Sequence, residues 1–138
     1  MEDFLSFHHI GIACHDIEKS KAFYLDQGYA AAKTVYDPLQ RVYVCFLEKS
    51  GAPRLEMLQP EGDDSPVART LETAGVTPYH LCYEVEDLDD AIARLRTSRR
   101  FLLVNGPVPA CAMGDRRVAF MFQKLTGLIE LVEAFPAS

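Results

Sequence analysis

Apolar and polar positions follow a pattern that predicts the same order of elements twice along this chain. In the first half, apolar residues recur first at strand spacing, then at helical spacing, and then at strand spacing again. Asp16 is a favourable N-cap for the helix, and Gly28 is a favourable residue to follow its end. The expected elements are a strand at 7–14, a helix at 17–27, a short strand near 29–36, and a hairpin of 41–48 and 54–59.

The second half repeats this β-α-β-β-β order after a linker at residues 61–78. The linker contains a short helix, with Ser65 as N-cap, Pro66 as its first residue and Gly75 after its end. The elements that follow are a strand at 79–86, a helix from Asp87 to about Ser98, a strand near 101–104, and a hairpin of 117–123 and 128–133. The segment between them, 105–115, is rich in Gly and Pro and is expected to be a loop that could act as a lid.

Sequence similarity between the two halves supports a duplication. Residues 9–17 match 80–88 at an offset of 71, residues 41–46 match 117–122 at 76, and residues 55–58 match 129–132 at 74. Each copy therefore carries one His and one Glu at equivalent positions.

Composition narrows the classes of partner. The 138 residues are enough for one domain with a core, and we predict a single domain over 1–138, with module one at about 7–60 and module two at about 79–134. The net charge of −6 and the lack of a basic patch argue against nucleic acid and anionic membranes. No apolar run is long enough to span a membrane, and the first residues do not resemble a signal peptide. We therefore expect a cytoplasmic protein that acts on a small molecule.

The four cysteines do not form a CxxC motif and are widely spaced. Metal-binding thiols usually come in close pairs, so a cysteine-based zinc site is disfavoured. The cysteines are expected to be reduced and mostly buried.

Four side chains form the strongest candidate site: His9, Glu56, His80 and Glu130. Alternate residues of a strand share a face, so strands from two related units can each direct one side chain into a common concavity. Two imidazoles and two carboxylates suit a divalent ion such as Zn, Ni, Co, Mn or Fe(II). A six-coordinate ion would keep two positions open for two oxygens of a substrate.

Each of these residues also has a plainer interpretation. A lone histidine on a strand is more often a core or surface residue, and His8 competes with His9 for the role. The repeat favours His9, because His9 and His80 are each followed by the same apolar pattern and by an Asp seven residues later. Glu56 and Glu130 are flanked by apolar residues on both sides, unlike a typical solvent-facing glutamate.

At these residues the chain resembles the vicinal oxygen chelate superfamily, which includes glyoxalase I, bleomycin resistance proteins, extradiol dioxygenases and methylmalonyl-CoA epimerase. The resemblance covers essentially the whole chain, and residues 55–60 followed by 65–72 are most similar to the epimerase branch. The other motifs that carry it are His9-Ile-Gly-Ile-Ala with Asp16 and Phe23-Tyr24, His80-Leu-Cys-Tyr-Glu-Val with Asp87-Leu, Arg117-Val-Ala-Phe, and Gly127-Leu-Ile-Glu-Leu.

This resemblance implies an α+β fold in which two paired βαβββ modules form a cupped mixed sheet around one divalent metal, often in a homodimer. It also implies Lewis-acid chemistry, in which the metal chelates vicinal oxygens, stabilises an enolate or related oxyanion and eases removal of a neighbouring proton. In glyoxalase-like members a glutamate ligand can leave the metal and act as the base, which makes Glu130 and Glu56 the candidate catalytic residues.

The chain departs from some epimerases, which use a further glutamate on the third strand of module one. Here that strand, 41–47, has no carboxylate before Glu48. Tyr43 on this strand could donate a proton, but its ordinary pKa of about 10 makes it a poor base. Tyr43 and Lys124 are the candidate substrate-binding residues. Four arginines could also meet a phosphate or carboxylate group, although solvated hairpin positions are the commoner role: Arg41, Arg54, Arg116 and Arg117.

Several functions stay open on the sequence. The favoured one is a metal-dependent isomerase, epimerase or lyase that acts on a proton α to the carbonyl of an acyl thioester or hemithioacetal, because an acidic fourth ligand supplies a base. An Fe(II) dioxygenase could use His9, His80 and Glu130, but Glu56 would then crowd the oxygen-binding side. A non-catalytic binding protein of the resistance type and a diverged enzyme on the same fold are also compatible with the sequence.

Overall fold

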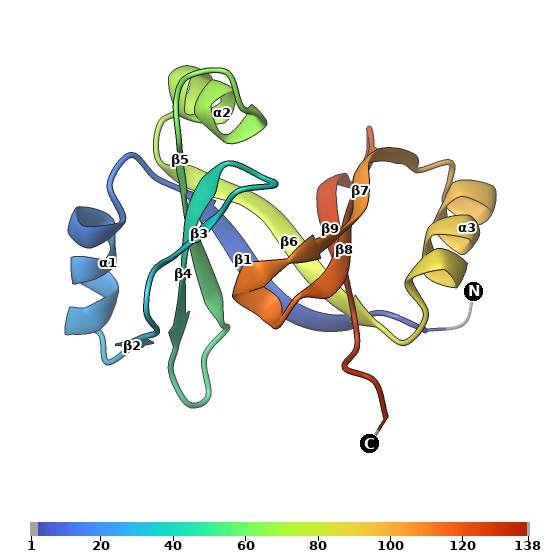
Figure 1. Cartoon of the computed structure of the whole chain (residues 1–138), viewed down its shortest axis with the longest axis horizontal. Coiled ribbons are helices and arrows are strands. Elements are labelled where there is room, and N and C mark those ends of the chain that lie inside the picture. The colour runs from blue at the N-terminus through green and yellow to red at the C-terminus, as the bar shows by residue number, and fades with distance from the viewer. Residues whose placement is uncertain (1–2, 138) are drawn as a thin grey trace. The chain divides into compact units, whose positions relative to one another are not determined.

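The computed structural model describes residues 3–137 (Figure 1). Within that range the chain forms nine strands, three α-helices and one 3-10 turn. It divides into two compact units: a first unit of residues 9–79, and a second unit whose described residues are 3–8 and 80–137. The predicted α+β class and the repeated β-α-β-β-β order are confirmed.

The first unit holds a sheet in the strand order β2-β4-β5-β1, and β3 also pairs with β4. β1 and β5 are parallel, whereas β4 runs antiparallel to β5. The strand expected near 29–36 is split into two short pieces. The elements are β1 (Ser6–Ala13), α1 (Ile17–Asp26), β2 (Ala30–Ala31), β3 (Val35–Asp37), β4 (Val42–Glu48), β5 (Leu55–Pro60) and α2 (Pro66–Ala74).

The second unit has the same plan in the strand order β6-β9-β8-β7. β6 and β9 are parallel, and β8 runs antiparallel to both β9 and β7. The elements are β6 (Thr77–Val85), α3 (Leu88–Arg99), β7 (Leu102–Ala110), η1 (Cys111–Met113), β8 (Arg116–Gln123) and β9 (Gly127–Glu133).

The expectation of a loop over 105–115 is wrong for 105–110, because β7 extends through Ala110, whereas the role of the segment as a lid stays a prediction. Register shifts on either side of Asn105 interrupt the ladder with β8, and β7 lies at the end of the strand order. Proline and glycine are tolerated at such bulges and edges, which accommodates Gly106 and Pro107. Gly106 has a φ of 94° and lies so close to β8 that a Cβ there would be 2.5 Å from the Val118 carbonyl oxygen.

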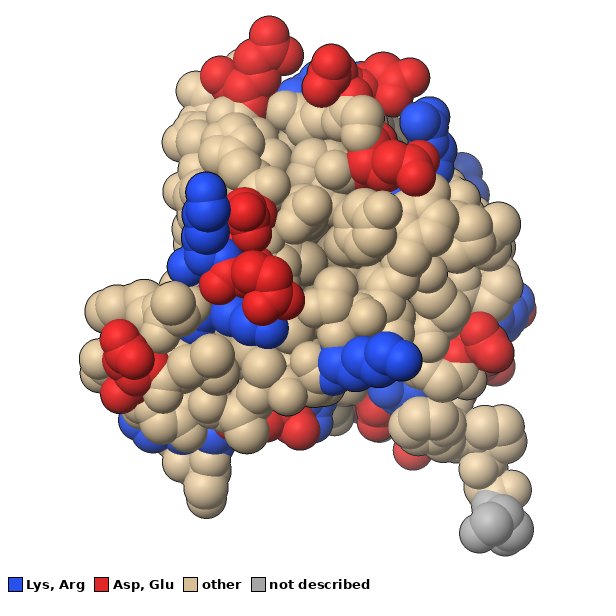
Figure 2. Space-filling model, turned by 60° about the vertical axis from the view of Figure 1, so that its left-hand side comes forward, with Lys and Arg blue, Asp and Glu red and all other residues tan. Residues whose placement is uncertain are grey.

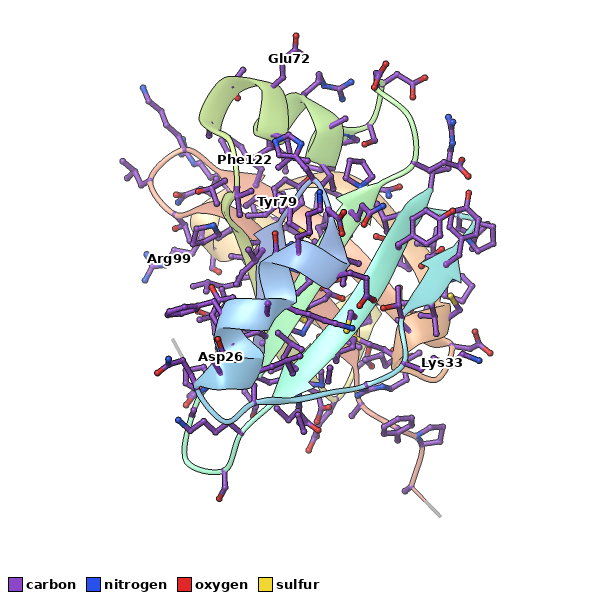
Figure 3. The ribbon with its side chains drawn as sticks, turned by 90° about the vertical axis from the view of Figure 1, so that its left-hand side faces the viewer. Asp26, Lys33, Glu72, Tyr79, Arg99 and Phe122 are labelled. Carbon is purple, nitrogen blue, oxygen red and sulfur yellow. The ribbon has the colours of Figure 1, made fainter. Side chains whose placement is uncertain are left out.

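In each unit one helix, α1 or α3, packs against one face of the strands, and an apolar core lies between them. We call this face the helix face. In the first unit, α1 covers this helix face of the sheet, as Figure 3 shows for the helix that ends at Asp26. The core residues of the first unit are Ile12, Cys14, Ile17, Cys45, Leu47, Leu55 and Met57. Those of the second unit are Val85, Leu88, Ala91, Ile92, Leu95, Phe101, Ala119, Met121, Ile129 and Leu131. Burial of side chains of this size stabilises the fold by about 1.5–3 kcal/mol for each large one.

Two side chains anchor the start of α1. The Asp16 carboxylate accepts a hydrogen bond from the Lys19 N–H at 3.2 Å, as predicted for an N-cap. The side-chain oxygen of Gln59, on β5, accepts the Ile17 N–H at 3.0 Å. The first turn of α1 is therefore tied directly to the last strand of its unit.

The start of α3 is anchored in the same way. The Asp87 carboxylate accepts the Asp90 N–H at 3.0 Å, and a Glu133 oxygen, on β9, accepts the Leu88 N–H at 3.0 Å. Arg117 donates to the same Glu133 carboxylate at 2.9 Å. We call a strand side chain that accepts a hydrogen bond from the first N–H of a helix a clamp. Gln59 is the clamp of the first unit, and the ion-paired Glu133 is the clamp of the second.

Strand pairing corrects the expected alignment of the two hairpins. Phe46 lies opposite Glu56 on the neighbouring strand, and Phe120 lies opposite Glu130. Both pairs correspond at an offset of 74, not at the 76 suggested by matching 41–46 with 117–122.

Backbone conformation supports the offset of 74. Arg41 and Asp115, which this offset makes equivalent, have left-handed φ values of 55° and 61° just before β4 and β8. Arg41 and Arg117 are therefore not equivalent, although each is followed by Val. Arg41 is the left-handed residue just before β4, whereas Arg117 lies inside β8.

The Glu133 clamp predicts a pH dependence of stability. The hydrogen bond from Arg117, followed by that from the Leu88 N–H, lowers the pKa of Glu133. The stability it contributes is therefore present above the ordinary glutamate pKa of about 4.3 and is lost as the pH falls through the lowered value. Glu133→Gln keeps an acceptor but loses the charge, so we expect the free energy of unfolding to fall by about 1 kcal/mol at neutral pH.

Urea unfolding from about pH 7 to about pH 3 measures this effect. The difference between wild type and Glu133→Gln should shrink across the acidic range, and Glu86→Gln, at an exposed position after β6, should follow the wild type throughout. A Glu133→Gln difference that stays constant over the whole range would contradict the assignment.

Candidate metal centre

His9 and Glu56 form a buried pair in the first unit. Gly11 on β1 pairs with Glu56 on the parallel strand β5. Alternate residues of a strand share a face, so His9 points to the same side as Gly11 and Glu56. His9 Nε2 lies 3.1 Å from a Glu56 carboxylate oxygen, and the two side chains are 0% and 5% exposed. The structure therefore brings together the two candidate ligands of this unit, which are 47 positions apart in sequence.

The second unit repeats this pair with the same geometry. Cys82 on β6 pairs with Glu130 on the parallel strand β9, and His80 lies two residues before Cys82. His80 Nε2 lies 3.1 Å from a Glu130 carboxylate oxygen, and the side chains are 1% and 2% exposed. Each unit thus contains one buried His–Glu pair at the same place in its parallel strand pairing.

Both pairs lie on the strand face that points away from the helix, which we call the His–Glu face. Next to the glutamate, this face carries Val44, Phe46 and Leu58 in the first unit and Val118, Phe120 and Val132 in the second. A carboxylate in such surroundings requires a positive or hydrogen-bonding neighbour, because apolar side chains cannot replace its hydration. In both units an imidazole nitrogen lies 3.1 Å from the carboxylate, and a divalent cation would suit the same donors.

The third strand of the first module, β4, has one acidic side chain on this face, Glu48 at its exposed end, which pairs with Arg54 at 2.7 Å. β4 pairs with β5 in continuous register, so Val42, Val44 and Phe46 point to the same side as Glu56. Val42 and Val44 are both 4% exposed. The sequence predicts no base inside this strand, and apolar side chains occupy the strand face beside the His9–Glu56 pair.

The structure separates Tyr43 from this face. Tyr43 lies opposite Gln59 on the helix side of β4, and its ring packs against that of Tyr36 with a centroid distance of 5.0 Å. Strand alternation thus turns Tyr43 away from His9 and Glu56, and its contact with substrate stays a prediction. Lys124 lies exposed in the turn between β8 and β9, where its proposed contact with substrate stays a prediction.

The four arginines that the sequence offers for anion binding all form ion pairs with neighbouring carboxylates. The pairs are Arg41–Glu61 at 3.3 Å, Arg54–Glu48 at 2.7 Å, Arg116–Glu84 at 2.7 Å and Arg117–Glu133 at 2.9 Å. Figure 2 shows basic side chains lying among acidic ones on one face of the molecule. Arginines that are paired with carboxylates in this way are typical of a protein surface, and they are less typical of a site that binds an anion.

Sequence reasoning missed Phe46 and Phe120, which lie beside the glutamates on the His–Glu faces. Each precedes its glutamate by ten positions, a spacing that the sequence does contain. The hairpin alignment at an offset of 76 concealed this spacing, because it matched Phe46 with Phe122.

None of the four cysteines forms a disulfide bond, and three of them are buried: Cys14, Cys45 and Cys82. Burial raises the pKa of the Cys14 thiol to about 11, so this thiol is protonated at neutral pH. Cys111 in the 3-10 turn is exposed. The Cys14 environment therefore fits a structural thiol better than a metal ligand.

Thiol labelling of the native protein should therefore reach Cys111 first. At about pH 8, Ellman's reagent should react rapidly with about one thiol per folded chain, because the other three thiols are buried and out of its reach. Cys111→Ser should remove this rapid phase, and denaturation should expose all four thiols of the wild type. Rapid labelling that persists in Cys111→Ser would contradict the burial of the other three.

None of the helices in the part of the chain that the structure describes is long and apolar enough to cross a membrane.

Comparison with known proteins places this geometry in a family. Residues 8–120 match the glyoxalase/bleomycin resistance protein/dioxygenase superfamily. Mitochondrial methylmalonyl-CoA epimerase of Homo sapiens is 34% identical over 131 residues, which cover 91% of this chain and 72% of the human protein. Ethylmalonyl-CoA/methylmalonyl-CoA epimerase of Cereibacter sphaeroides is 32% identical over 120 residues, covering 84% of this chain and 87% of that protein.

A solved structure agrees with these sequence matches. The crystal structure of methylmalonyl-CoA epimerase from Mycobacterium tuberculosis superposes with a TM-score of 0.85 at 27% identity, covering 99% of this chain and 93% of that chain. With 99% of this chain covered, the match extends through both units. The chain belongs to the glyoxalase/bleomycin resistance protein/dioxygenase superfamily.

Proposed function

We propose that this protein is a divalent-metal-dependent epimerase or isomerase that removes a proton α to the carbonyl of an acyl thioester. The observation that carries the proposal is the duplicated His–Glu pair, buried in each unit with the same 3.1 Å contact and the same strand register. Buried charged groups are costly to maintain, and two equivalent pairs of this composition are typical of a functional site.

The proposed metal ligands are His9, Glu56, His80 and Glu130. Two imidazole nitrogens and two carboxylates form a donor set that suits Zn, Ni, Co, Mn or Fe(II), and the carboxylates balance the charge of a divalent ion. A metal held by these residues would supply Lewis-acid stabilisation of the negative charge that develops on the carbonyl oxygen when the α-proton leaves.

The base in this proposal is one of the two buried glutamates. Val42 and Val44 occupy the His–Glu face of β4. Within the first unit, Glu56 is therefore the buried carboxylate on this face that could act as the base. In the second unit Glu130 lies beside Val118 and Phe120 in the same way. Apolar neighbours disfavour the charged form of a carboxyl group, which makes a carboxylate a stronger base once it is released from a cation.

The names of two relatives support a substrate class for this proposal. The human and Cereibacter sphaeroides proteins are named for epimerisation of methylmalonyl-CoA, and the latter also for ethylmalonyl-CoA. In such a substrate the exchangeable proton lies between a thioester carbonyl and a carboxylate. We therefore propose a 2-substituted malonyl thioester as the first substrate to test, with the hemithioacetals of glyoxalase-like chemistry as the second.

Metal content tests the ligand set. Protein loaded with Zn²⁺ or Co²⁺ and freed of excess ion should contain about one divalent ion per chain. Glu130→Ala and Glu56→Ala should each lose most of this ion, because each removes an anionic ligand. Glu86→Ala and Glu72→Ala are the matched controls, since both residues are exposed and should bind as the wild type does. Loading that is equal in all five proteins would exclude these ligands.

Solvent deuterium exchange tests the reaction. The metal-loaded enzyme in D₂O should exchange the α-proton of a 2-methylmalonyl thioester, followed by mass spectrometry and chiral analysis of the product. Glu130→Gln or Glu56→Gln, assayed at saturating metal, should slow exchange by about 10²–10⁴-fold if that glutamate is the base. Oxygen consumption without exchange would instead indicate the dioxygenase chemistry of the same superfamily.

A further inference from the structure

An aromatic ring contacts the histidine of each His–Glu pair. The Phe46 ring meets the His9 imidazole edge to face, with a centroid distance of 5.2 Å and an interplanar angle of 82°. The Phe120 ring meets the His80 imidazole at 5.4 Å, also at 82°. The two units thus place a phenyl ring against the imidazole with almost the same distance and orientation.

The same two rings also lie beside the glutamates. Phe46 is directly opposite Glu56 in the β4–β5 ladder, and Phe120 is directly opposite Glu130 in the β8–β9 ladder. Directly opposite residues on adjacent strands are close enough for their side chains to touch. One phenylalanine per unit therefore adjoins both members of the His–Glu pair.

A purely space-filling role does not account for this arrangement. Neither phenylalanine belongs to the buried core that packs under α1 or α3, because both lie on the opposite strand face. Other phenylalanines of the chain differ from them in environment: Phe122 on β8 is 41% exposed, and Phe23 on α1 is 64% exposed. The recurrence of the contact in two units with different sequences around it points to a role in the His–Glu pair itself.

We propose that Phe46 and Phe120 are positioning residues that fix the imidazole planes of His9 and His80 and shield each His–Glu pair from water. An edge-to-face contact restricts rotation of the imidazole about its final side-chain torsion, so its Nε2 atom stays directed toward the glutamate. The phenyl ring also excludes water from the carboxylate, which strengthens the electrostatic interaction of the pair with any cation. This inference rests on the proposed metal-binding role of the two pairs.

The expected consequence is a loss of metal affinity when the ring is removed. Groups that orient a metal ligand without touching the metal typically change affinity by about 10- to 100-fold. Phe46→Leu and Phe120→Leu remove the flat ring edge but keep an apolar side chain, so each should weaken Zn²⁺ binding by about 10-fold or more. Phe46→Tyr and Phe120→Tyr keep the ring and should stay within about threefold of the wild type.

Competition of the full chain with a chromogenic chelator for Zn²⁺ measures these affinities. The matched controls are Phe122→Leu, on the same strand and face as Phe120, and Phe23→Leu in the first unit. Thermal unfolding of the metal-free proteins is measured in parallel, and affinity is compared only at temperatures where each variant is folded. The absorption spectrum of the Co²⁺ form provides a second readout, because it reports ligand geometry independently of stability.

The outcomes separate the two proposals. Leu variants that lose affinity and alter the Co²⁺ spectrum, while Tyr variants and controls do not, would support the positioning role. Wild-type affinity in both Leu variants, or equal losses in the Leu and Tyr variants, would overturn it and leave the metal site intact. A loss accounted for by the unfolded fraction would also overturn it. A wild-type protein that binds neither Zn²⁺ nor Co²⁺ would overturn both proposals.

Discussion

The parallel pairing of the first and last strands in each unit is the constraint on which the site depends. It sets β1 beside β5 and β6 beside β9, and so brings a histidine within 3.1 Å of a glutamate that lies far along the chain. Parallel strands cannot be joined by a tight turn, so the helix and hairpin between them are required for this pairing. A slip of one residue in either register would turn the glutamate to the helix face and destroy the pair.

The two faces of each sheet divide the tasks of stability and chemistry. The helix face holds the apolar core and is fixed by the clamps from Gln59 and Glu133 to the first turns of α1 and α3. The other face can then carry buried ionisable groups, whose desolvation opposes folding. Because strand side chains alternate, a single set of strands supplies both surfaces.

The two units are alike at the pair and differ elsewhere. At the offset of 74, the neutral Gln59 corresponds to the ion-paired Glu133, and the buried Val42 corresponds to Arg116, which binds Glu84. In both units the histidine lies 3.1 Å from the glutamate, and a phenylalanine ring packs edge to face against the histidine. Such a distribution is typical of a duplicated module in which function constrains the centre of the sheet while its ends and helix contacts have diverged. The shared glutamates are therefore the proposed bases, and not a residue of the third strand.

The sequence by itself determined the element order, the helix caps at Asp16, Ser65 and Asp87, and the choice of His9, Glu56, His80 and Glu130 as candidates. These features depend on local preferences and on a repeat, both of which are written directly in the chain. Only the tertiary structure decided the hairpin register, the extension of β7 through Gly106 and Pro107, and the face on which Tyr43 lies. It also revealed Phe46 and Phe120 beside the pairs. Register is set by pairing between distant strands, and a shift of one residue reverses every side chain, so local sequence similarity could not fix it.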